Sequence, residues 1–324
     1  MFDYQSLNRT EAAEVLTNIA NGSYNNEQIA SFITVYLMRP ITMEELLGFR
    51  QALLDMALPV DLSEFDPIDI VGTGGDGKNT FNISTLSCLV LAGAGFKVAK
   101  HGNYGATSVS GASNVLEYYG AKFTTDISAI KTAMDKAGFA FLHAPLFNPA
   151  MKTVAPIRKA LAVRTFFNVM GPLISPVKPK YQMLGVYSLT MLRLYNYVSQ
   201  HLGINYTLVH SLDGYDEVSL TADTKVVSNT REELFSPAAM GFPTFRQEEL
   251  SGGNTIDDAA KIFMNVLENR ATEPQRAVVT ANSAFAVQTL RPEMSFEEAK
   301  NIAAESLASG KAKQAFEKFL EIYK

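Results

Sequence analysis

Residues 68–84 read IDIVGTGGDGKNTFNIS, a short apolar run that leads into a glycine-rich loop. The run at 68–71 predicts a buried strand, and four glycines follow it within six residues: Gly72, Gly74, Gly75 and Gly77. Glycine lets backbone N–H groups turn toward a ligand without interference from a Cβ atom. A helical pattern begins near residue 83, and a helix start adds unpaired N–H donors and a positive dipole end. The stretch therefore predicts a strand–loop–helix unit that holds an anion, most simply a phosphate.

Two better-known phosphate motifs nearly match this loop. Three of its glycines fit the G-x-G-x-x-G pattern of dinucleotide-binding folds, which needs an acidic residue about 20 positions later. The corresponding region, 96–101, is cationic instead. Gly77 and Lys78 also fit a P-loop, but Asn79 stands where that motif places Ser or Thr on magnesium. Both motifs fail at the residue that carries their chemistry, and a glycine-rich turn without a ligand stays the alternative.

Composition limits the kind of protein. The chain has 324 residues, of which 47% are hydrophobic and 19% charged, as in ordinary globular proteins. The net charge of −5 argues against a general nucleic-acid surface. Cys88 is the single cysteine, which excludes an internal disulfide and suits a reducing compartment. The N-terminus lacks a signal-peptide pattern, and no apolar run approaches the ~18 residues of a membrane span. We expect a cytoplasmic protein without membrane or nucleic-acid partners.

The spacing of apolar residues changes near residue 68. Before it the pattern is helical, and Thr42 and Glu45 have the spacing of a capping box. After it, runs that predict strands lie at 68–71, 96–100, 139–143, 182–187 and 205–210. Helical segments near 83–94, 127–137 and 189–202 alternate with them, 149–170 is predicted helical, and helices fill most of the C-terminal third. This alternation predicts an α/β fold with a mainly parallel sheet and helices on its faces.

Two further polar loops follow predicted strands. The loop at 100–113 begins with Lys100 and His101 and is rich in glycine and hydroxyl side chains, which suits a second phosphate or ribose. The loop at 211–219 contains Asp216 and Glu217. Ligands of open α/β sheets sit beyond the carboxyl ends of strands, so we expect the three loops to share one edge. There the two acids would hold magnesium against phosphates, the alternative being a solvated acidic turn.

No residue pattern marks a covalent nucleophile. His101 and His210 are each candidates for a general base, whereas His143 and His201 are interpreted as structural. Cys88 lies in an apolar helical segment and is expected in the core. No catalytic residue is therefore assigned.

Five motifs in order closely resemble the anthranilate phosphoribosyltransferase family, a branch of the type IV phosphoribosyltransferases, over nearly the whole chain. They are Gly72–Asp76 and Asn79–Ser84, Lys100–Asn103, the stretch from Pro149 through Arg158 to Pro172, and Asp213–Glu217. The resemblance implies a small N-terminal all-helical domain, residues 1–65 joined by 150–172, and a large α/β domain at 66–149 and 173–324. It further implies a homodimer formed through the helical domain. The implied reaction joins anthranilate to phosphoribosyl pyrophosphate, with Mg²⁺, two ions per monomer, in L-tryptophan biosynthesis.

The resemblance also implies site residues. Phosphoribosyl pyrophosphate would contact both glycine-containing loops and the helix start between them: Gly72, Gly75, Asp76, Thr80, Asn82, Ile83, Ser84, Thr85, Lys100, His101, Gly102, Asn103, Tyr104, Gly105, Ala106, Thr107, Ser108 and Ala112. Anthranilate would contact Gly72, Asn103 and Arg158. Magnesium would contact Ser84, Asp216 and Glu217. The sequence departs from the commonest family residues at Tyr104, Ala112, Asn114 and Asn148.

Two other functions fit the same fold. A pyrimidine nucleoside phosphorylase would bind a nucleoside and inorganic phosphate and would have no use for the Asp216–Glu217 pair. A non-catalytic relative that binds nucleic acid would have lost this pair and gained a basic surface, which the net charge of −5 argues against.

Overall fold

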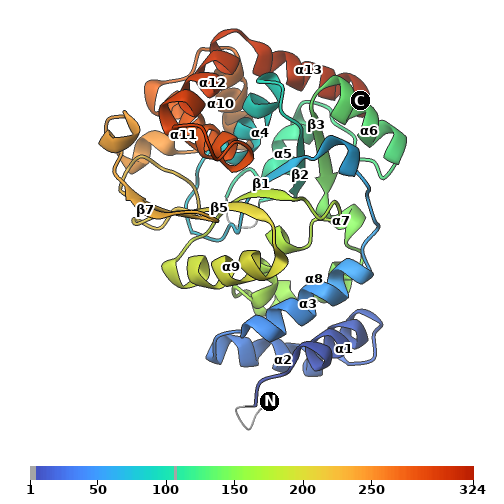
Figure 1. The fold of residues 1–324 in the computed structure, drawn as a ribbon. Coiled ribbons are helices and arrows are strands. Elements are labelled where there is room, and N and C mark those ends of the chain that lie inside the picture. The colour runs from blue at the N-terminus through green and yellow to red at the C-terminus, as the bar shows by residue number, and fades with distance from the viewer. Residues whose placement is uncertain (1–4, 106–107) are drawn as a thin grey trace. The chain divides into compact units, whose positions relative to one another are not determined.

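The computed structural model describes residues 5–105 and 108–324, which form two compact units. The first unit comprises the chain up to Val60 together with Ala144–Lys178, and the second comprises Asp61–His143 and Pro179–Lys324 (Figure 1). None of the helices in the described residues is long and apolar enough to cross a membrane.

The first unit is entirely helical. Its helices are α1 (Arg9–Ala20), α2 (Asn26–Met38), α3 (Met43–Asp55), α7 (Ala144–Phe147) and α8 (Met151–Leu161). The predicted capping box of Thr42 and Glu45 is confirmed at the start of α3. Aromatic rings of α2 and α3 pack against Phe166, with the Phe49 and Phe166 rings stacked at 4.9 Å between centroids. This aromatic cluster joins α2 and α3 to the turn that contains Phe166.

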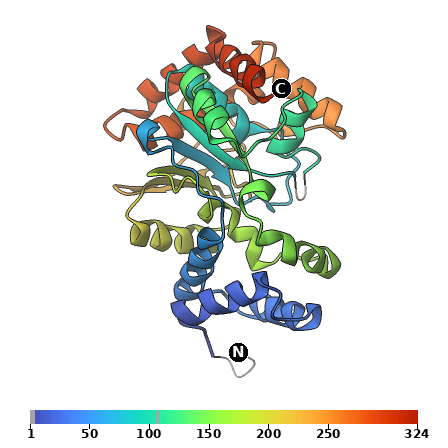
Figure 2. The same ribbon diagram turned by 90° about the vertical axis from the view of Figure 1, so that its right-hand side faces the viewer.

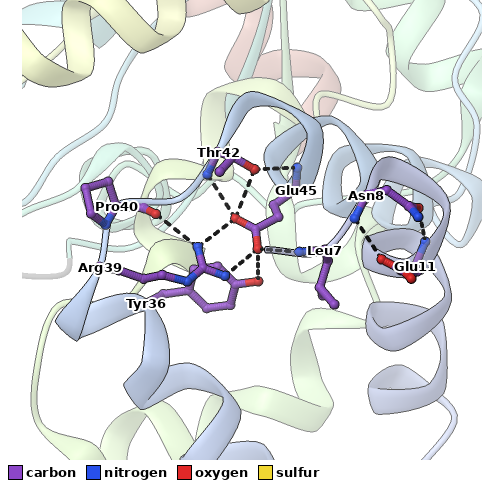
Figure 3. A network of polar contacts seen from close by, with 8 residues as sticks. All are labelled: Leu7, Asn8, Glu11, Tyr36, Arg39, Pro40, Thr42 and Glu45. Atoms are coloured by element: carbon purple, nitrogen blue, oxygen red, sulfur yellow. Dashed lines mark hydrogen bonds and ion pairs between the residues drawn. The ribbon is translucent and has the colours of Figure 1, made fainter. Parts of the chain in front are cut away.

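A buried carboxylate ties these helices together (Figure 3). Glu45 is fully buried and accepts hydrogen bonds from both terminal nitrogens of Arg39, at 2.5 and 2.9 Å. The Tyr36 hydroxyl and the Leu7 N–H donate to the same carboxylate, both at 3.1 Å. Burial raises the pKa of Glu45, but its hydrogen bonds from Arg39, Thr42 and Leu7 outweigh burial and lower it to about 2. The charge is thus stabilised inside the unit by a complete set of donors.

The helical interval predicted at 149–170 is correct only in its first half. Helix α8 ends at Leu161, because Ala162 takes a left-handed conformation with φ of 53°. Two short 3₁₀ turns, Phe166–Val169 and Gly171–Leu173, follow in place of a continuing helix. Left-handed residues commonly end helices, but an alanine gives no sequence signal for one.

The second unit is built on a seven-stranded sheet in the order β3-β2-β1-β4-β5-β6-β7. Its parallel strands are β1 (Ile68–Gly72), β2 (Val98–Gly102), β3 (Phe139–His143), β4 (Tyr181–Gly185) and β5 (Asn205–Ser211). They confirm the strands predicted from the apolar runs. An antiparallel pair at the edge, β6 (Thr224–Ser228) and β7 (Glu232–Phe235), was not predicted. In β7 three of the four residues are exposed, so that strand lacks the apolar run that marks a buried one.

Helices cover both faces of this sheet. They are α4 (Ile83–Gly93), α5 (Ala112–Tyr118), α6 (Ile127–Lys136), α9 (Leu189–Leu202), α10 (Ile256–Leu267), α11 (Glu273–Leu290), α12 (Phe296–Ala308) and α13 (Lys311–Tyr323). Helix α9 lies on one face, and α4 with α11 lies on the other, as Figure 1 and Figure 2 both show. Helix α4 is buried along nearly its whole length, and Cys88 within it lies in the core as predicted. The predicted fold of a helical domain and a mainly parallel α/β domain is confirmed.

Candidate active site

The loops after β1, β2 and β5 meet at one edge of the sheet. The Gly74 N–H donates to Asp216 Oδ2 at 2.6 Å, which joins the first loop to the acidic loop. The Val109 N–H donates to Asn79 Oδ1 at 3.1 Å, which joins the second loop to the first. The prediction that the three polar loops share the carboxyl edge is therefore confirmed.

The glycines of the first loop have the conformations that its shape requires. Gly74, Gly75 and Gly77 all have φ between 62° and 76°, a region that other residues rarely adopt. Gly72 has no such torsion, but a Cβ atom on it would collide with the carboxylate of Asp216. The loop is thus shaped both to turn sharply and to leave room for an acidic side chain.

The acidic side chains of this edge are poorly neutralised. Burial, and then the neighbouring Asp76, raises the pKa of Asp216 to about 7. Burial together with Asp216 and Asp76 raises the pKa of Glu217 well above its ordinary value, although Lys100 acts in the opposite direction. Burial also raises the pKa of Asp76. Such a group of acids favours a cation between them.

The side chains at this edge are suitable ligands for a magnesium ion that a phosphate also binds. Among the described residues, no three His, Cys, Asp or Glu side chains are grouped so as to hold a metal ion alone. Mg²⁺ commonly binds through one or two carboxylates and completes its shell with substrate phosphates and water. Asp216 and Glu217 provide that pair, and Glu217 lies within hydrogen-bonding distance of the Ser84 N–H, at 3.3 Å. The chemistry of the residues therefore fits the ion implied by the sequence.

The first turn of α4 contributes in two ways. Ile83 and Thr85, predicted substrate contacts in this turn, are both buried, and the Ile83 N–H donates to the Phe81 carbonyl at 2.7 Å. Ser84 is partly exposed, and its hydroxyl accepts a hydrogen bond of 3.2 Å from Lys100 Nζ. Lys100 also donates to the Ile70 carbonyl at 2.6 Å, so this buried amine is fixed beside the helix start. A fixed cation at a helix start favours an anionic ligand.

The remaining predicted residues of the first loop lie next to the acids. Thr80 is partly buried, and its hydroxyl lies 3.4 Å from Glu217 Oε2. Asn82 is buried and donates to the Ser110 carbonyl at 3.2 Å. These contacts place the polar side chains of this loop between the acidic pair and the second loop.

The second loop is exposed where it leaves β2. His101 is buried, and its backbone N–H donates to Asp69 Oδ1 at 3.4 Å. Asn103 and Gly105 are exposed. Tyr104 is 42% exposed and donates from its hydroxyl to Glu117 Oε1 at 2.8 Å. Of the other predicted residues, Gly102, Ser108 and Ala112 are partly buried, and Ala106 and Thr107 lie outside the described residues.

Arg158 lies in helix α8 of the helical unit. Its Nη2 donates to Asn168 Oδ1 at 3.4 Å, and its guanidinium lies 5.6 Å from the ring centre of Phe167. Burial lowers the pKa of Arg158. Within the described ranges 5–105 and 108–324 this guanidinium forms no ion pair, so its charge suits a carboxylate ligand.

The histidines have different surroundings. His210 is buried with Nδ1 2.8 Å from the Val186 carbonyl, which occupies one ring nitrogen of this candidate base. His143 bonds the Ser113 hydroxyl at 2.8 Å and stacks on Phe123.

Sequence reasoning missed two features of this edge. The first is Asp69 in β1, a fully buried carboxyl whose pKa burial raises to about 7 and whose Oδ2 has no hydrogen-bond partner within the described part of the chain. An acid inside an apolar run was the available signal. The second is the segment 247–253, which bonds Lys78 and Asn79 of the first loop. Its sequence shows no motif that would have placed it there.

Comparisons with known proteins identify the family. The model of the glycosyl transferase family, a/b domain, matches residues 64–313, and that of the family's helical bundle domain matches residues 1–57. Anthranilate phosphoribosyltransferase of Bacteroides fragilis (strain YCH46) is 59% identical over 322 residues, which cover 99% of this chain and 97% of that protein. The same enzyme of Cytophaga hutchinsonii is 53% identical, over 96% of this chain and 95% of the relative.

Solved structures agree with these relatives. Anthranilate phosphoribosyltransferase from Thermus thermophilus superposes with a TM-score of 0.91 at 31% identity, covering 98% of this chain and 96% of that one. The Saccharomyces cerevisiae enzyme, in complex with phosphoribosyl pyrophosphate and Mg, has a TM-score of 0.90 at 29% identity, covering 98% and 93%. These matches confirm the resemblance found in the sequence motifs. They also confirm the prediction that the protein is an enzyme of the pentosyltransferase class. The chain therefore belongs to the anthranilate phosphoribosyltransferase family of glycosyl transferases.

Proposed function

We propose that this protein transfers the 5-phosphoribosyl group from phosphoribosyl pyrophosphate to the amine of anthranilate, in L-tryptophan biosynthesis. The products are N-(5-phosphoribosyl)anthranilate and pyrophosphate. One observation carries the proposal beyond the family: Asp216 and Glu217 bond the backbone of the glycine loop and of the α4 start, at Gly74 and Ser84. An acidic pair on an anion-binding backbone suits a ligand that is a magnesium-bound polyphosphate.

The two loops and the α4 start are proposed to bind phosphoribosyl pyrophosphate, with the residues named from the sequence. Ser84, Asp216 and Glu217 are proposed to hold Mg²⁺, with two ions per monomer. When bound, the ions would neutralise the charge that develops on the leaving pyrophosphate. Support comes from the raised pKa values of the acids and from the Mg-bound yeast relative.

Arg158, with Gly72 and Asn103, is proposed to bind anthranilate. A guanidinium can grip a carboxylate with two parallel hydrogen bonds, which fixes the orientation of the ring. The lack of an ion pair for Arg158 within the described residues supports this role, because its buried charge gains most from a carboxylate. A yeast relative is described with 4-fluoroanthranilate bound.

Displacement at the anomeric carbon needs positioning and leaving-group stabilisation more than a strong base. The aromatic amine of anthranilate is neutral near pH 7, so attack needs no prior deprotonation. This agrees with the surroundings of His210, whose Nδ1 lies against a backbone carbonyl. We assign no covalent nucleophile and no general base.

We further propose a cytoplasmic homodimer formed through the helical domain, without nucleic-acid or membrane partners. Leu37 and Met38, at the end of α2, are 45% and 85% exposed, which supports an apolar contact surface. The proposed domain limits are 1–65 with 150–172 for the helical domain, and 66–149 with 173–324 for the α/β domain.

A fluorescence assay tests the proposed reaction. Anthranilate is fluorescent, and its emission should fall only when enzyme, phosphoribosyl pyrophosphate and Mg²⁺ are all present. Phosphorolysis of thymidine or uridine without added metal, with no loss of anthranilate emission, would instead establish the nucleoside phosphorylase alternative.

A further inference from the structure

Asn79 links the glycine loop to two other segments of the α/β unit through its side chain. Its Oδ1 accepts a hydrogen bond from the Val109 N–H at 3.1 Å, and its Nδ2 donates to the Gly253 carbonyl at 2.7 Å. A carboxamide can accept through its oxygen and donate through its nitrogen at the same time. Asn79 is exposed and both ends of its amide contact protein backbone, so the arrangement joins segments of the chain.

The backbone on one side of Asn79 is firmly placed. The Gly252 N–H donates to the Asn79 carbonyl at 2.7 Å, and Thr80 forms a β-bridge with Ser251. A Cβ atom on Gly252 would lie only 2.6 Å from the Thr80 carbonyl oxygen, so this close approach depends on glycine. Segment 251–253 therefore gives the Asn79 side chain a fixed support.

On its other side Asn79 holds the part of the second loop that leads toward α5. Val109 lies between Ser108, a proposed contact of the substrate, and Ser110. The Ser110 carbonyl accepts a hydrogen bond from Asn82, which also belongs to the first loop. Two adjacent residues of the second loop are thus bonded to two asparagines of the first.

Asn114 links two glycines within the second loop, Gly105 and Gly111. Asn114 Oδ1 accepts hydrogen bonds from the Gly105 N–H at 3.0 Å and from the Gly111 N–H at 2.9 Å. A Cβ atom on Gly111 would collide with the backbone at Gly105, so these two glycines lie in direct contact. Asn114 keeps the loop closed at its base, whereas Asn79 sets where the loop lies against the glycine loop.

We propose that Asn79 is a positioning residue that holds the second loop against the glycine loop and so strengthens binding of the doubly phosphorylated substrate. The proposal rests on the proposed function for the identity of that substrate. When the two loops are already aligned, their hydrogen-bond donors need not be ordered as the substrate binds. The smaller entropy cost improves affinity.

Kinetics of Asn79→Ala test the effect on binding. Loss of the bond to Val109 should raise KM for phosphoribosyl pyrophosphate about three- to tenfold, the range of one neutral hydrogen bond. The kcat should change by less than about twofold, because both ends of the Asn79 amide bond protein backbone and its proposed role is confined to positioning the loop. Asn301→Ala is the matched control: it removes an exposed asparagine from α12 and should leave both constants unchanged.

Amide hydrogen exchange of the substrate-free protein tests the positioning itself. In Asn79→Ala the Val109 N–H should exchange about three- to tenfold faster than in wild type. Asn79→Asp keeps the acceptor for Val109 and loses the donor to Gly253, so its Val109 exchange should lie between the two. A Tm equal to that of wild type would show that both variants are folded.

An unchanged KM would overturn the proposal, whether or not Val109 exchange rises, because the loop would then be held without benefit to binding. An unchanged Val109 exchange rate in Asn79→Ala would overturn it as well. A wild-type protein inactive with anthranilate and phosphoribosyl pyrophosphate would refute the proposed function instead, and Val109 exchange would still decide whether Asn79 holds the loop.

Discussion

Buried carboxylates occur in both units, but their surroundings are opposite. Glu45 of the helical unit accepts hydrogen bonds from Arg39, Tyr36 and the Leu7 backbone, and its pKa falls to about 2. Asp216 of the α/β unit accepts one from the Gly74 backbone, faces other acids, and has its pKa raised to about 7. A buried charge with all its donors supplied holds a fold together, whereas an under-neutralised group of acids is suited to a cation.

Two arginines repeat the contrast. Arg39 forms a paired hydrogen bond to Glu45, and its charge is used within the protein. The guanidinium of Arg158 contacts the amide oxygen of Asn168 and the Phe167 ring and forms no ion pair in the described residues. The difference separates a structural arginine from one proposed to bind substrate.

The largest effect is expected for the double variant Asp216→Asn, Glu217→Gln, which keeps shape and removes charge. Its kcat should fall about 100- to 1000-fold, because stabilisation of the leaving pyrophosphate is lost. The Mg²⁺ concentration for half-maximal rate should rise. Its thermal stability without metal should match or exceed wild type, since poorly neutralised acids are removed. A strongly destabilised variant would mean that these acids support the fold as Glu45 does.

The opposite pattern is expected for Glu45→Gln. Removing this charge leaves Arg39 without its partner and should lower the free energy of unfolding by about 3 kcal/mol, with normal kinetics in the folded fraction. Denaturation followed by circular dichroism measures this, since the chain has no tryptophan. Glu44→Gln, one residue away and exposed, is the control and should change little. Equal stabilities of the two variants would contradict the structural role of Glu45.

The same carboxylate predicts a pH dependence. Its pKa is lower in the folded state, so its stabilisation is complete above the ordinary pKa of about 4.5 and disappears as pH falls toward 2. Between about pH 4.5 and 2 the free energy of unfolding should fall by about 3 kcal/mol more in wild type than in Glu45→Gln. Parallel stability curves for the two proteins would show that Glu45 does not titrate in this way.

A smaller effect is expected for Arg158→Ala. Use of anthranilate should weaken about 10- to 100-fold, because a hydrogen bond to a charged group contributes roughly 1.5–3 kcal/mol. Affinity for phosphoribosyl pyrophosphate should barely change. Lys159→Ala removes a neighbouring exposed charge and serves as the control. Unaltered KM and kcat for anthranilate would refute the role of Arg158.

The smallest effect is expected for Tyr104→Phe. The Tyr104 hydroxyl bonds Glu117 at the exposed surface, so its loss should change KM for phosphoribosyl pyrophosphate by about twofold or less. Tyr104→Arg should be tolerated, because arginine can pair with Glu117 as well. Complete inactivity of Tyr104→Phe, measured by the fluorescence assay, would make this tyrosine a catalytic residue.

Much of the α/β unit could be predicted because local patterns agree with the fold. The apolar runs of β1 to β5 and the glycines after β1 mark a parallel sheet with a phosphate-binding edge. The antiparallel strands β6 and β7 escaped prediction because they form a short edge hairpin, and three of the four residues of β7 are exposed, so no buried apolar run marks that strand. The break of the helix at Ala162 likewise escaped prediction, because no glycine or proline marks it in the sequence.

The candidate site could be proposed from the sequence where one loop carries its own chemistry, as with the glycine-rich loop after β1 or the Asp216–Glu217 pair. It was not predictable where a role depends on a partner far along the chain. Asn79 was interpreted as a failed P-loop residue and as the first residue of a family motif, but its links to other segments were missed, because its contacts with Val109 and Gly253 lie 30 and 174 residues away. The same holds for Asp69, whose significance depends on its complete burial.

Calorimetry of phosphoribosyl pyrophosphate binding, with and without Mg²⁺, tests most directly whether the acidic pair serves a cation and a polyphosphate. The wild-type protein should bind the substrate more tightly with Mg²⁺ present. In the Asp216→Asn, Glu217→Gln variant, binding without Mg²⁺ should be equal or stronger, because repulsion of the phosphates is removed, and Mg²⁺ should add little. A wild-type response to Mg²⁺ in the double variant would remove Asp216 and Glu217 from the metal site and contradict the account.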